Sequence, residues 1–301
     1  MINEIKLLSE ILPSLHSDKD VKVGPGDDCA VVEHGGYLVL LAVDQLIGDI
    51  HYIYDETPPE VVGAKLLKRN LSDIAAMGGK ARYALVGLAA AKPGMDWLKR
   101  FFKGLEDEAV KYNVSIVGGD VSSLKNDMPP VASLTICGSM SQGMQPCLRS
   151  NAVPGQLLYA TGCFGNSFKS GHHLNFTPRL EEAKFLSGEF TNTMIDVSDG
   201  LLQDSRRLAA ASGCGLMIDV SAVPLRDGAD AESALTEGED YELIFAVSRE
   251  KFSTLESAWP FKDVPLTRIG MFTGSPKGEV VDSDGRKLID IYGKEGFQHE
   301  F

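Results

Sequence analysis

Apolar and polar positions along the first half of the chain predict alternating helices and strands. Apolar residues recur every three or four positions in the opening segment, which is typical of an amphipathic helix, whereas the aliphatic run 37–43 is typical of a buried strand. Segment 60–77 follows Pro58 and Pro59 and precedes Gly78, the usual start and stop signals of a helix. The predicted elements of this half are helices over 5–15, 60–77 and 95–112 and strands over 37–43, 82–90, 114–117 and 131–140.

The second half carries a similar pattern after a turn-rich segment, 141–154. Turn residues gathered between patterned stretches are typical of a connection between domains. Strands are predicted over 156–161, 192–197, 214–220, 241–247 and 264–272, and helices over 164–173, 179–187 and 201–212. We therefore expect an α/β (α+β) protein of two domains, 1–144 and 145–301, which suits a length of 301 residues.

The net charge and composition of the chain limit the classes of partner that it is expected to bind. The chain has 44% hydrophobic residues and a formal net charge of −13, a globular composition with an acidic balance. A protein that binds nucleic acid or an anionic membrane needs a basic surface, so neither partner is expected. The sequence has no apolar run of the roughly 18 residues that span a bilayer, and acidic residues interrupt the N-terminus where a signal peptide is apolar. A cytoplasmic location is therefore expected.

The most informative polar residues are aspartates placed in turns and at the predicted ends of elements. They are Asp27, Asp28, Asp44, Asp73, Asp120, Asp196 and Asp199. A single aspartate in such a place often only caps a helix or starts a turn. Several together would repel one another unless cations lie between them, and carboxylate oxygens are ligands that suit Mg²⁺. The pattern therefore favours a magnesium site that serves a phosphorylated substrate.

Motifs that bind phosphate in other protein classes are missing. The sequence contains no GxxxxGK[ST] loop, no GxGxxG turn, and no HRD or DFG motif of a protein kinase. A triphosphate can still bind an acidic protein through bridging metal ions. Gly118 and Gly119 would let backbone N–H groups approach an anion, and Lys65 and Arg149 are candidate counter-charges. The residues alone assign no role to His51, and they indicate no nucleophilic triad.

Seven short motifs, taken in order, resemble the signature of a known family. They are Gly26-Asp-Asp-Cys-Ala30, Gly48-x-x-His-Tyr52, Asn70-Leu-Ser-Asp-Ile-Ala-Ala-Met-Gly78, Gly118-Gly-Asp120, Arg149-Ser150, Asp196-Val-Ser-Asp-Gly-Leu201 and Gly238-Glu-Asp-Tyr-Glu-Leu243. Over nearly the whole chain they resemble the thiamine-monophosphate kinase family, and the closing segment 296–301 resembles that family's aromatic C-terminal motif. Some motifs are shared with aminoimidazole ribonucleotide synthetase and selenophosphate synthetase, whereas the last of the seven and His51 favour the kinase.

The resemblance implies a two-domain fold like that of aminoimidazole ribonucleotide synthetase, in a homodimer whose N-terminal domains pair into an inter-subunit β-barrel. It implies an enzyme that transfers the γ-phosphoryl group of ATP directly to thiamine phosphate, giving thiamine diphosphate. Mg²⁺ would be the cofactor, and positioning and charge neutralisation would replace a catalytic side chain. The metal ligands would be Asp28, Asp44, Asp73, Asp120, Asp196 and Asp199. ATP would contact Gly119, Asp120, Arg149 and Ser198, and thiamine phosphate would contact His51, Glu239 and Phe297.

One stretch departs from the family pattern. The family usually has two hydroxyl residues before the aspartate that ends the strand, and here the stretch reads Ala42-Val43-Asp44-Gln45. Two neutral oxygen ligands are missing, although water can replace such ligands on Mg²⁺. Two alternatives therefore stay open: an ATP-dependent synthetase-like relative that acts on another small substrate, and a non-catalytic nucleotide-binding relative.

Overall fold

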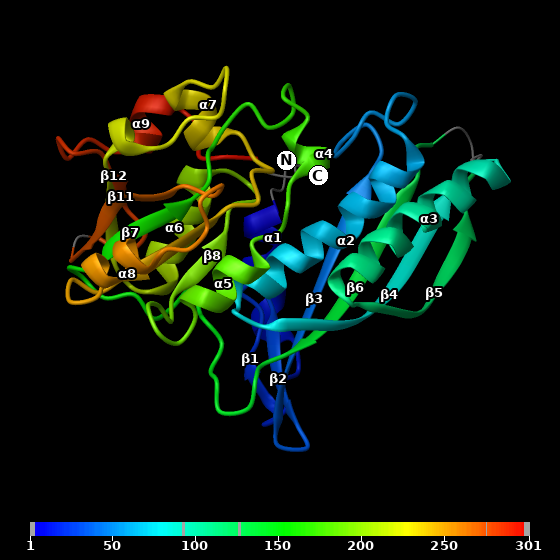
Figure 1. Cartoon of the computed structure of the whole chain (residues 1–301), viewed down its shortest axis with the longest axis horizontal. Coiled ribbons are helices and arrows are strands. Elements are labelled where there is room, and N and C mark those ends of the chain that lie inside the picture. The colour runs from blue at the N-terminus through cyan, green and yellow to red at the C-terminus, as the bar shows by residue number, and fades with distance from the viewer. Residues whose placement is uncertain (1–3, 92–93, 126–127, 275, 298–301) are drawn as a thin grey trace.

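The computed structural model describes residues 4–91, 94–125, 128–274 and 276–297, and it contains two six-stranded sheets (Figure 1). The first sheet has the strand order β1-β2-β3-β6-β4-β5. Its strands are β1 (Val21–Val23), β2 (Ala30–His34), β3 (Tyr37–Ile47), β4 (Lys80–Ala90), β5 (Ser115–Ser123) and β6 (Val131–Ser139). Neighbouring strands pair antiparallel except β4 and β5, which are parallel.

The second sheet has the order β12-β9-β11-β7-β10-β8. Its strands are β7 (Leu157–Thr161), β8 (Met194–Asp196), β9 (Gly215–Ile218), β10 (Leu243–Val247), β11 (Leu266–Thr273) and β12 (Val280–Val281). Every residue of the paired strands β7 and β10 is buried, because helices cover both faces of this sheet. The predicted mixed α/β class is confirmed. The predicted domain boundary at 144/145 lies in the segment between the two sheets and stays a prediction.

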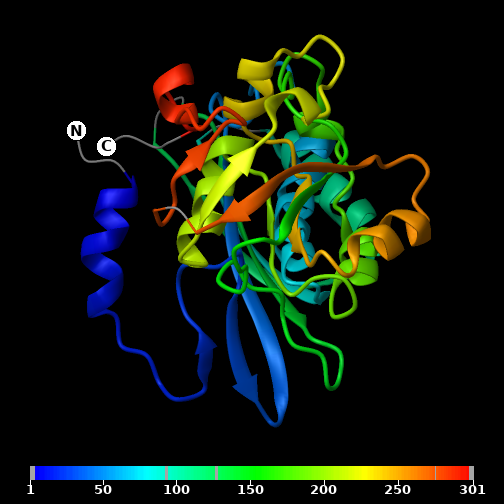
Figure 2. The ribbon, with the colours of Figure 1, turned by 90° about the vertical axis from the view of Figure 1, so that its left-hand side faces the viewer.

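Helices cover the two sheets differently. α2 (Pro59–Ala76) and α3 (Met95–Tyr112) lie on one face of the first sheet (Figure 1). In the second half, α5 (Leu180–Leu186) and α8 (Phe252–Ala258) pack on one face of the sheet, and α6 (Leu201–Ala211), α7 (Ala231–Thr236) and α9 (Leu288–Tyr292) pack on the other. The shorter helices are η1 (Leu12–Ser14), α4 (His172–Asn175) and η2 (Val220–Ala222), and α1 (Glu4–Ile11) stands to one side of the molecule (Figure 2). Among the described residues, no helix is long and apolar enough to cross a membrane.

Helix α2 belongs to the cores of both halves. Leu67 and Ile74 pack in the first core against the sheet residue Leu134. Ala75 and Ala76, in the last turn, pack in a core of the second half with α5 and the strands β7, β8 and β10. Polar side chains on α2 are therefore held at the junction of the two halves.

The other face of the first sheet carries exposed apolar side chains. They are Leu41, Val43, Tyr83, Leu85 and Val117. Their positions alternate with buried residues along β3 and β4, because successive side chains of a strand point to opposite faces. An apolar sheet face of this kind is typical of an interface with another chain.

Two predicted strands are longer in the structure, and both corrections concern candidate site residues. The strand predicted over 37–43 continues as β3 to Ile47, so Asp44 lies within the strand and pairs with Leu134 of β6 rather than ending it. The strand predicted over 114–117 continues as β5 to Ser123, so Asp120 lies within a strand and pairs with Gly87 of β4. In both places, backbone pairing with a neighbouring strand continues beyond the predicted end of the strand and includes the polar residue.

Other predictions were partly wrong. The helix predicted over 164–173 is mostly turns, and only α4 forms at its end. Strands β1, β2 and β12 and helices α7, α8 and α9 had not been predicted, and all of them are eight residues or shorter. Short elements present too little periodicity to be recognised in one sequence.

The crossing of α2 and α3 gives a stability prediction. A Cβ atom on Gly63 of α2 would lie 2.1 Å from the carbonyl oxygen of Phe101 on α3, a clash with rigid backbone. We expect Gly63→Ala to lower the free energy of unfolding by about 1–3 kcal/mol, because the helices must move apart. The measurement is urea unfolding. Gly24→Ala is the matched control, since nothing lies within 4 Å of a Cβ there, and equal losses in both variants would contradict the close approach.

Candidate active site

Three carboxylates from three separate elements converge beside α2. Asp28 lies in the loop between β1 and β2, Asp73 in the last turns of α2, and Asp196 at the end of β8. One oxygen of each lies within 4.8 Å of the others. We call these three residues the carboxylate cluster. Because its members come from both halves of the chain, the cluster forms only when the two halves pack together.

The carboxylate cluster is electrostatically unfavourable without a cation. Burial and then the nearby Asp44 raise the pKa of Asp73 well above its usual 3.8, and burial and then Asp28 raise that of Asp196. A donated hydrogen bond from the Ser72 hydroxyl to Asp196, at 2.6 Å, offsets part of this shift. A raised pKa in the folded state means that the cation-free fold loses stability as the pH rises above the usual carboxyl range. A bound cation would remove that loss.

Arg149 neutralises one edge of the carboxylate cluster. Its Nη2 donates to Asp28 Oδ1 at 2.5 Å, and its backbone N–H donates to Asp27 Oδ2 at 3.1 Å. Burial and then the Asp28 charge raise the pKa of Asp27 to about 6. The structure therefore brings the predicted residues Asp28 and Arg149 together, across the connection between the halves.

Asp199 and Ser198 lie in a neighbouring arrangement around Arg207. Arg207 Nη1 donates to Asp199 at 2.5 Å and to Asp204 at 2.8 Å. The backbone N–H groups of Ser198 and Asp199 both donate to Asp204 Oδ2, at 3.1 and 3.0 Å. Asp204, which lies on α6, thus holds the loop that carries both predicted residues, and Asp199 is not part of the carboxylate cluster.

Asp44 and Asp120 are also outside the carboxylate cluster. Asp44 pairs with Arg69 of α2, whose Nε donates to Asp44 Oδ2 at 3.2 Å. Asp120 is exposed on β5 and accepts a hydrogen bond from the Ser122 hydroxyl at 2.9 Å. Its neighbour Gly119 also lies in β5, where a Cβ would meet a carbonyl oxygen of β4 at 2.0 Å. Strands β6 and β4 lie between β3 and β5, which separates Asp44 from Asp120 by three strand spacings, about 14 Å.

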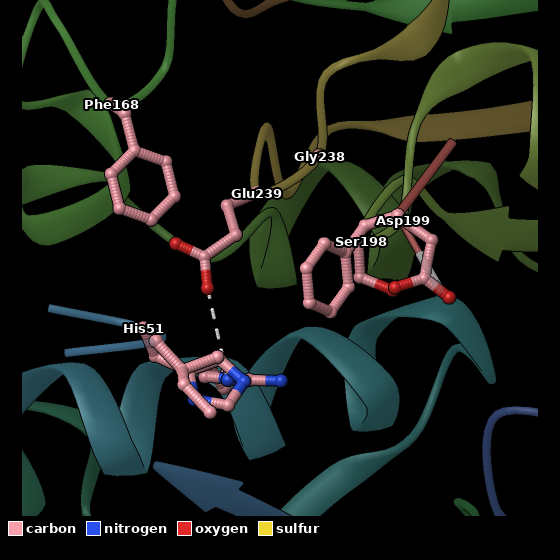
Figure 3. Close-up of a pocket in the computed structure, with 9 residues that line it drawn as sticks. His51, Phe168, Ser198, Asp199, Gly238 and Glu239 are labelled. Carbon is pink, nitrogen blue, oxygen red and sulfur yellow. Dashed lines mark ion pairs between the residues drawn. The ribbon is translucent and has the colours of Figure 1, made fainter. Parts of the chain in front are cut away.

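A pocket opens beside the carboxylate cluster. It is lined by Ile50, His51, Arg69, Phe168, Ser198, Asp199, Gly238, Glu239 and Phe297. Figure 3 shows Glu239 extending from its loop toward His51, with Phe168 on one side and Ser198 and Asp199 on the other. All three residues that the resemblance predicted for thiamine phosphate, His51, Glu239 and Phe297, therefore line one pocket.

Lys65 holds two residues of the pocket lining, Glu239 and His51, in position. Its ammonium group donates to Glu239 Oε2 and to the backbone oxygen of His51, both at 2.6 Å, and its side chain is fully buried. Burial lowers the pKa of Lys65 to about 8, and the Glu239 charge opposes that shift. Glu239 itself has a φ of 66°, in the left-handed region that non-glycine residues seldom adopt. The Lys65 contact is one interaction that holds it there.

The C-terminal wall of the pocket is tied to the Asp199 loop. The backbone N–H of Phe297 donates to Asp199 O at 2.9 Å, and Gln203 Nε2 donates to Phe297 O at 3.0 Å. The Phe297 side chain is nearly half exposed, as is that of Phe168 on the other wall. Phe168 stacks on His173 with ring centroids 4.0 Å apart. Two partly exposed aromatic residues therefore line opposite parts of the pocket.

Sequence reasoning did not predict Arg69 and Phe168 of the pocket lining, nor the partner of Lys65. Arg69 lies four residues before Asp73 on α2, a spacing that places both on one helix face, and this signal could have identified it. Phe168 lies in the turn-rich segment that was predicted as a helix, so nothing in the sequence marked it. Lys65 was only a candidate counter-charge, because its partner Glu239 lies 174 residues away.

Comparison with known proteins places the chain in a class. The model of the AIR synthase related protein N-terminal domain matches residues 26–140, and that of the C-terminal domain matches residues 164–283. The two domains cover most of both sheets, so the chain is a two-domain AIR synthase related protein and the predicted fold is confirmed. The inter-subunit barrel stays a prediction.

Similar whole proteins narrow this class. The thiamine-monophosphate kinase of Rhodopirellula baltica is 36% identical over 275 residues, with 84% of each chain covered, and that of Bacillus subtilis is 30% identical with 99% of each covered. The solved structure of AaThiL complexed with AMPPCP and TMP has a TM-score of 0.84 and 26% identity, and covers 99% of this chain and 97% of that one. The chain belongs to the thiamine-monophosphate kinase family.

The Lys65–Glu239 pair gives a second stability prediction. Lys65→Met should lower the free energy of unfolding by up to about 3–5 kcal/mol, because it leaves the buried Glu239 carboxylate with only the more distant Arg69 guanidinium, at 3.8 Å. Adding Glu239→Gln to Lys65→Met should then cost less than Glu239→Gln costs alone. The measurement is a double-mutant cycle by urea unfolding. The exposed pair Lys103–Asp107 of α3 is the matched control, and its coupling should be close to zero. Equal coupling in the two pairs would contradict the role given to Lys65.

Proposed function

We propose that this chain transfers the γ-phosphoryl group of ATP to thiamine phosphate, giving thiamine diphosphate and ADP. Membership of the thiamine-monophosphate kinase family supports the activity, and the similar AaThiL structure is complexed with AMPPCP, an ATP analogue, and TMP. The single observation within the chain that carries the proposal is the pocket, which joins His51, Glu239 and Phe297 beside the carboxylate cluster. The proposed site for thiamine phosphate therefore lies next to the proposed site for the metal-bound phosphates of ATP.

The transfer needs little covalent help from protein side chains. An oxygen of the acceptor phosphate is already ionised, so it attacks the γ-phosphorus without a general base. The bond between that phosphorus and the β–γ bridging oxygen breaks, and ADP leaves with the bonding electron pair. The protein's part is to align two anions and to offset their charge.

The carboxylate cluster fits a divalent cation. Its oxygens are hard ligands and lie close together, and burial first, then repulsion among the carboxylates, raises the pKa values of Asp73 and Asp196, so a bound cation would offset both effects. Asp28, Asp73 and Asp196 would hold Mg²⁺, which supplies positive charge to the phosphate groups. Arg149 and Ser198 lie beside these carboxylates and would contact ATP.

The pocket would bind the thiamine part of the acceptor. The thiazolium ring is a cation, and an aromatic face contributes roughly 0.5–2 kcal/mol to binding such a group. Phe168 and Phe297 present their partly exposed rings on the pocket walls, and Glu239 provides a carboxylate. Phe168 is therefore added to the substrate residues His51, Glu239 and Phe297.

Gly119 and Asp120 fit this scheme only in a dimer. They lie on β5, an edge strand about 14 Å from Asp44 within one chain. The proposed homodimer pairs the open apolar faces of two first sheets, and it would present Gly119 and Asp120 to the nucleotide of the other subunit. Burial of the exposed apolar residues of β3, β4 and β5 would supply the association energy. The predicted cytoplasmic location, and the expected lack of nucleic-acid and membrane partners, stay predictions.

The activity is tested by ADP release with ATP and Mg²⁺, with and without thiamine phosphate. We expect release to require both Mg²⁺ and thiamine phosphate, and thiamine diphosphate to appear in equal amount. Asp73→Asn should reduce turnover by at least about 10²-fold, since losing an anchoring ligand removes about 2.7 kcal/mol or more of transition-state stabilisation. Asp107→Asn, an exposed change on α3, is the matched control.

Other outcomes identify the alternatives. If ATP binds by calorimetry but thiamine phosphate never stimulates ADP release, the chain is a relative that acts on a different small substrate. If ATP does not bind at all, it is a non-catalytic relative. Full turnover in excess chelator would remove the role given to Mg²⁺.

The dimer is tested by a charge on the open sheet face. Val43 is 63% exposed on that face, and Val43→Lys should shift the sedimentation coefficient toward that of a monomer at micromolar concentration, because a buried lysine without a partner opposes association. Val110→Lys is the control, since Val110 is 70% exposed on α3. A parent chain that sediments as a fully active monomer would refute the dimer.

A further inference from the structure

Asp44 and Arg69 form a two-point ion pair at the border between the carboxylate cluster and the pocket. Arg69 Nε donates to Asp44 Oδ2 at 3.2 Å, and Nη2 donates to Oδ1 at 3.5 Å. The third nitrogen, Nη1, donates to the backbone oxygen of Gln45 at 3.0 Å. Both oxygens of Asp44 thus face one guanidinium, in the fork geometry that arginine favours with carboxylates.

The pair is sheltered from solvent. The Arg69 side chain is 12% exposed and that of Asp44 is 27% exposed. Arg69 Nη1 also lies 3.8 Å from Glu239 Oε1, so the guanidinium has carboxylates on two sides. An ion pair of low exposure is screened little by water, which makes it stronger than a surface pair.

Asp44 lies close enough to the carboxylate cluster to influence it. Its partner Arg69 lies about one helical turn before Asp73 on α2, so the ion pair and the cluster share one face of that helix. The three oxygens within 4.8 Å of one another nevertheless come from Asp28, Asp73 and Asp196, without Asp44. The Asp44 carboxylate is therefore near the cluster, but it pairs with the guanidinium of Arg69.

We propose that Arg69 is a built-in cation that takes the place of a divalent ion at Asp44. This inference rests on the proposed metal binding by the carboxylate cluster, and it replaces the metal-ligand role that the resemblance predicted for Asp44. Asp44 then acts as a positioning residue that holds the guanidinium between the cluster and the pocket. Divalent cations bind through Asp28, Asp73 and Asp196 only.

A fixed guanidinium differs from a bound ion in ways that matter here. It stays protonated throughout the physiological pH range and is not removed by chelators. It lies at the pocket that receives an acceptor phosphate, where a positive charge is needed whether or not the metal concentration is high. The Asp44 carboxylate is therefore balanced without a bound ion.

The test is Mn²⁺ binding to the full-length protein without nucleotide or thiamine phosphate, followed by electron paramagnetic resonance of free Mn²⁺. Mn²⁺ takes the same oxygen ligands as Mg²⁺. We expect Asp44→Asn to keep the parent's number of sites, with dissociation constants within about threefold, whereas Asp28→Asn weakens binding by at least about tenfold. Arg69→Met should gain one Mn²⁺ site, because it leaves the Asp44 carboxylate without its cation.

Three further variants separate charge from structure. Arg69→Lys keeps the charge and should gain no Mn²⁺ site, and Arg69→Met combined with Asp44→Asn should lose the site that Arg69→Met gains. Arg100→Met, which removes an exposed arginine paired with Glu60, is the control and should bind as the parent does. If Arg69→Met does not fold, Asp44→Asn still decides the question.

Two results would overturn the inference. Weaker Mn²⁺ binding or one site fewer in Asp44→Asn would make Asp44 a metal ligand in spite of Arg69. Unchanged Mn²⁺ binding in folded Arg69→Met would make the guanidinium a packing residue. Neither result depends on the acceptor, so a failure to phosphorylate thiamine phosphate would leave this test intact.

Discussion

Repulsion among buried carboxylates is the constraint on which the rest of the site depends. Asp28, Asp73 and Asp196 are brought together from a loop, a helix and a strand in two halves of the chain, and burial removes the water that would screen them. Folding tolerates this only because hydrophobic burial along α2 is extensive on both sides, with leucines facing one core and Ala75 and Ala76 facing another. The site is thus a strained region supported by the packing of a single helix.

Arginines neutralise the rim of this acidic region and leave its centre open. Arg149 pairs with Asp28, Arg207 with Asp199, and Arg69 with Asp44. Within the described part of the chain, no arginine pairs with Asp73 or Asp196. A bound cation would therefore stabilise the site most at Asp73 and Asp196. The carboxylates at the rim stay paired with arginines whether or not an ion is bound.

The sequence alone was sufficient to predict the helices and strands that have long periodic patterns and the motifs that contain charged residues. Helices α2 and α3 and the central strands could be predicted, because their apolar residues repeat over many positions. The contact of Lys65 with Glu239 could not, because it joins residues 174 apart through packing of the two halves. Nor could the position of Asp120, since pairing with β4 extends β5 through Gly118 and Gly119, residues that usually favour a turn.

The departure at Ala42 and Val43 takes on a different meaning once the two faces of β3 are distinguished. Val43 points to the open apolar face, whereas Ala42 packs toward the core on the same face as Asp44. A hydroxyl at position 43 would therefore lie away from the carboxylate cluster of its own chain, and valine there adds apolar area to the proposed dimer face. The Arg69 guanidinium pairs with Asp44 on this same face of β3. Where the strand offers fewer oxygen ligands for an ion, the facing turn of α2 supplies a positive charge of its own, so the carboxylate remains balanced.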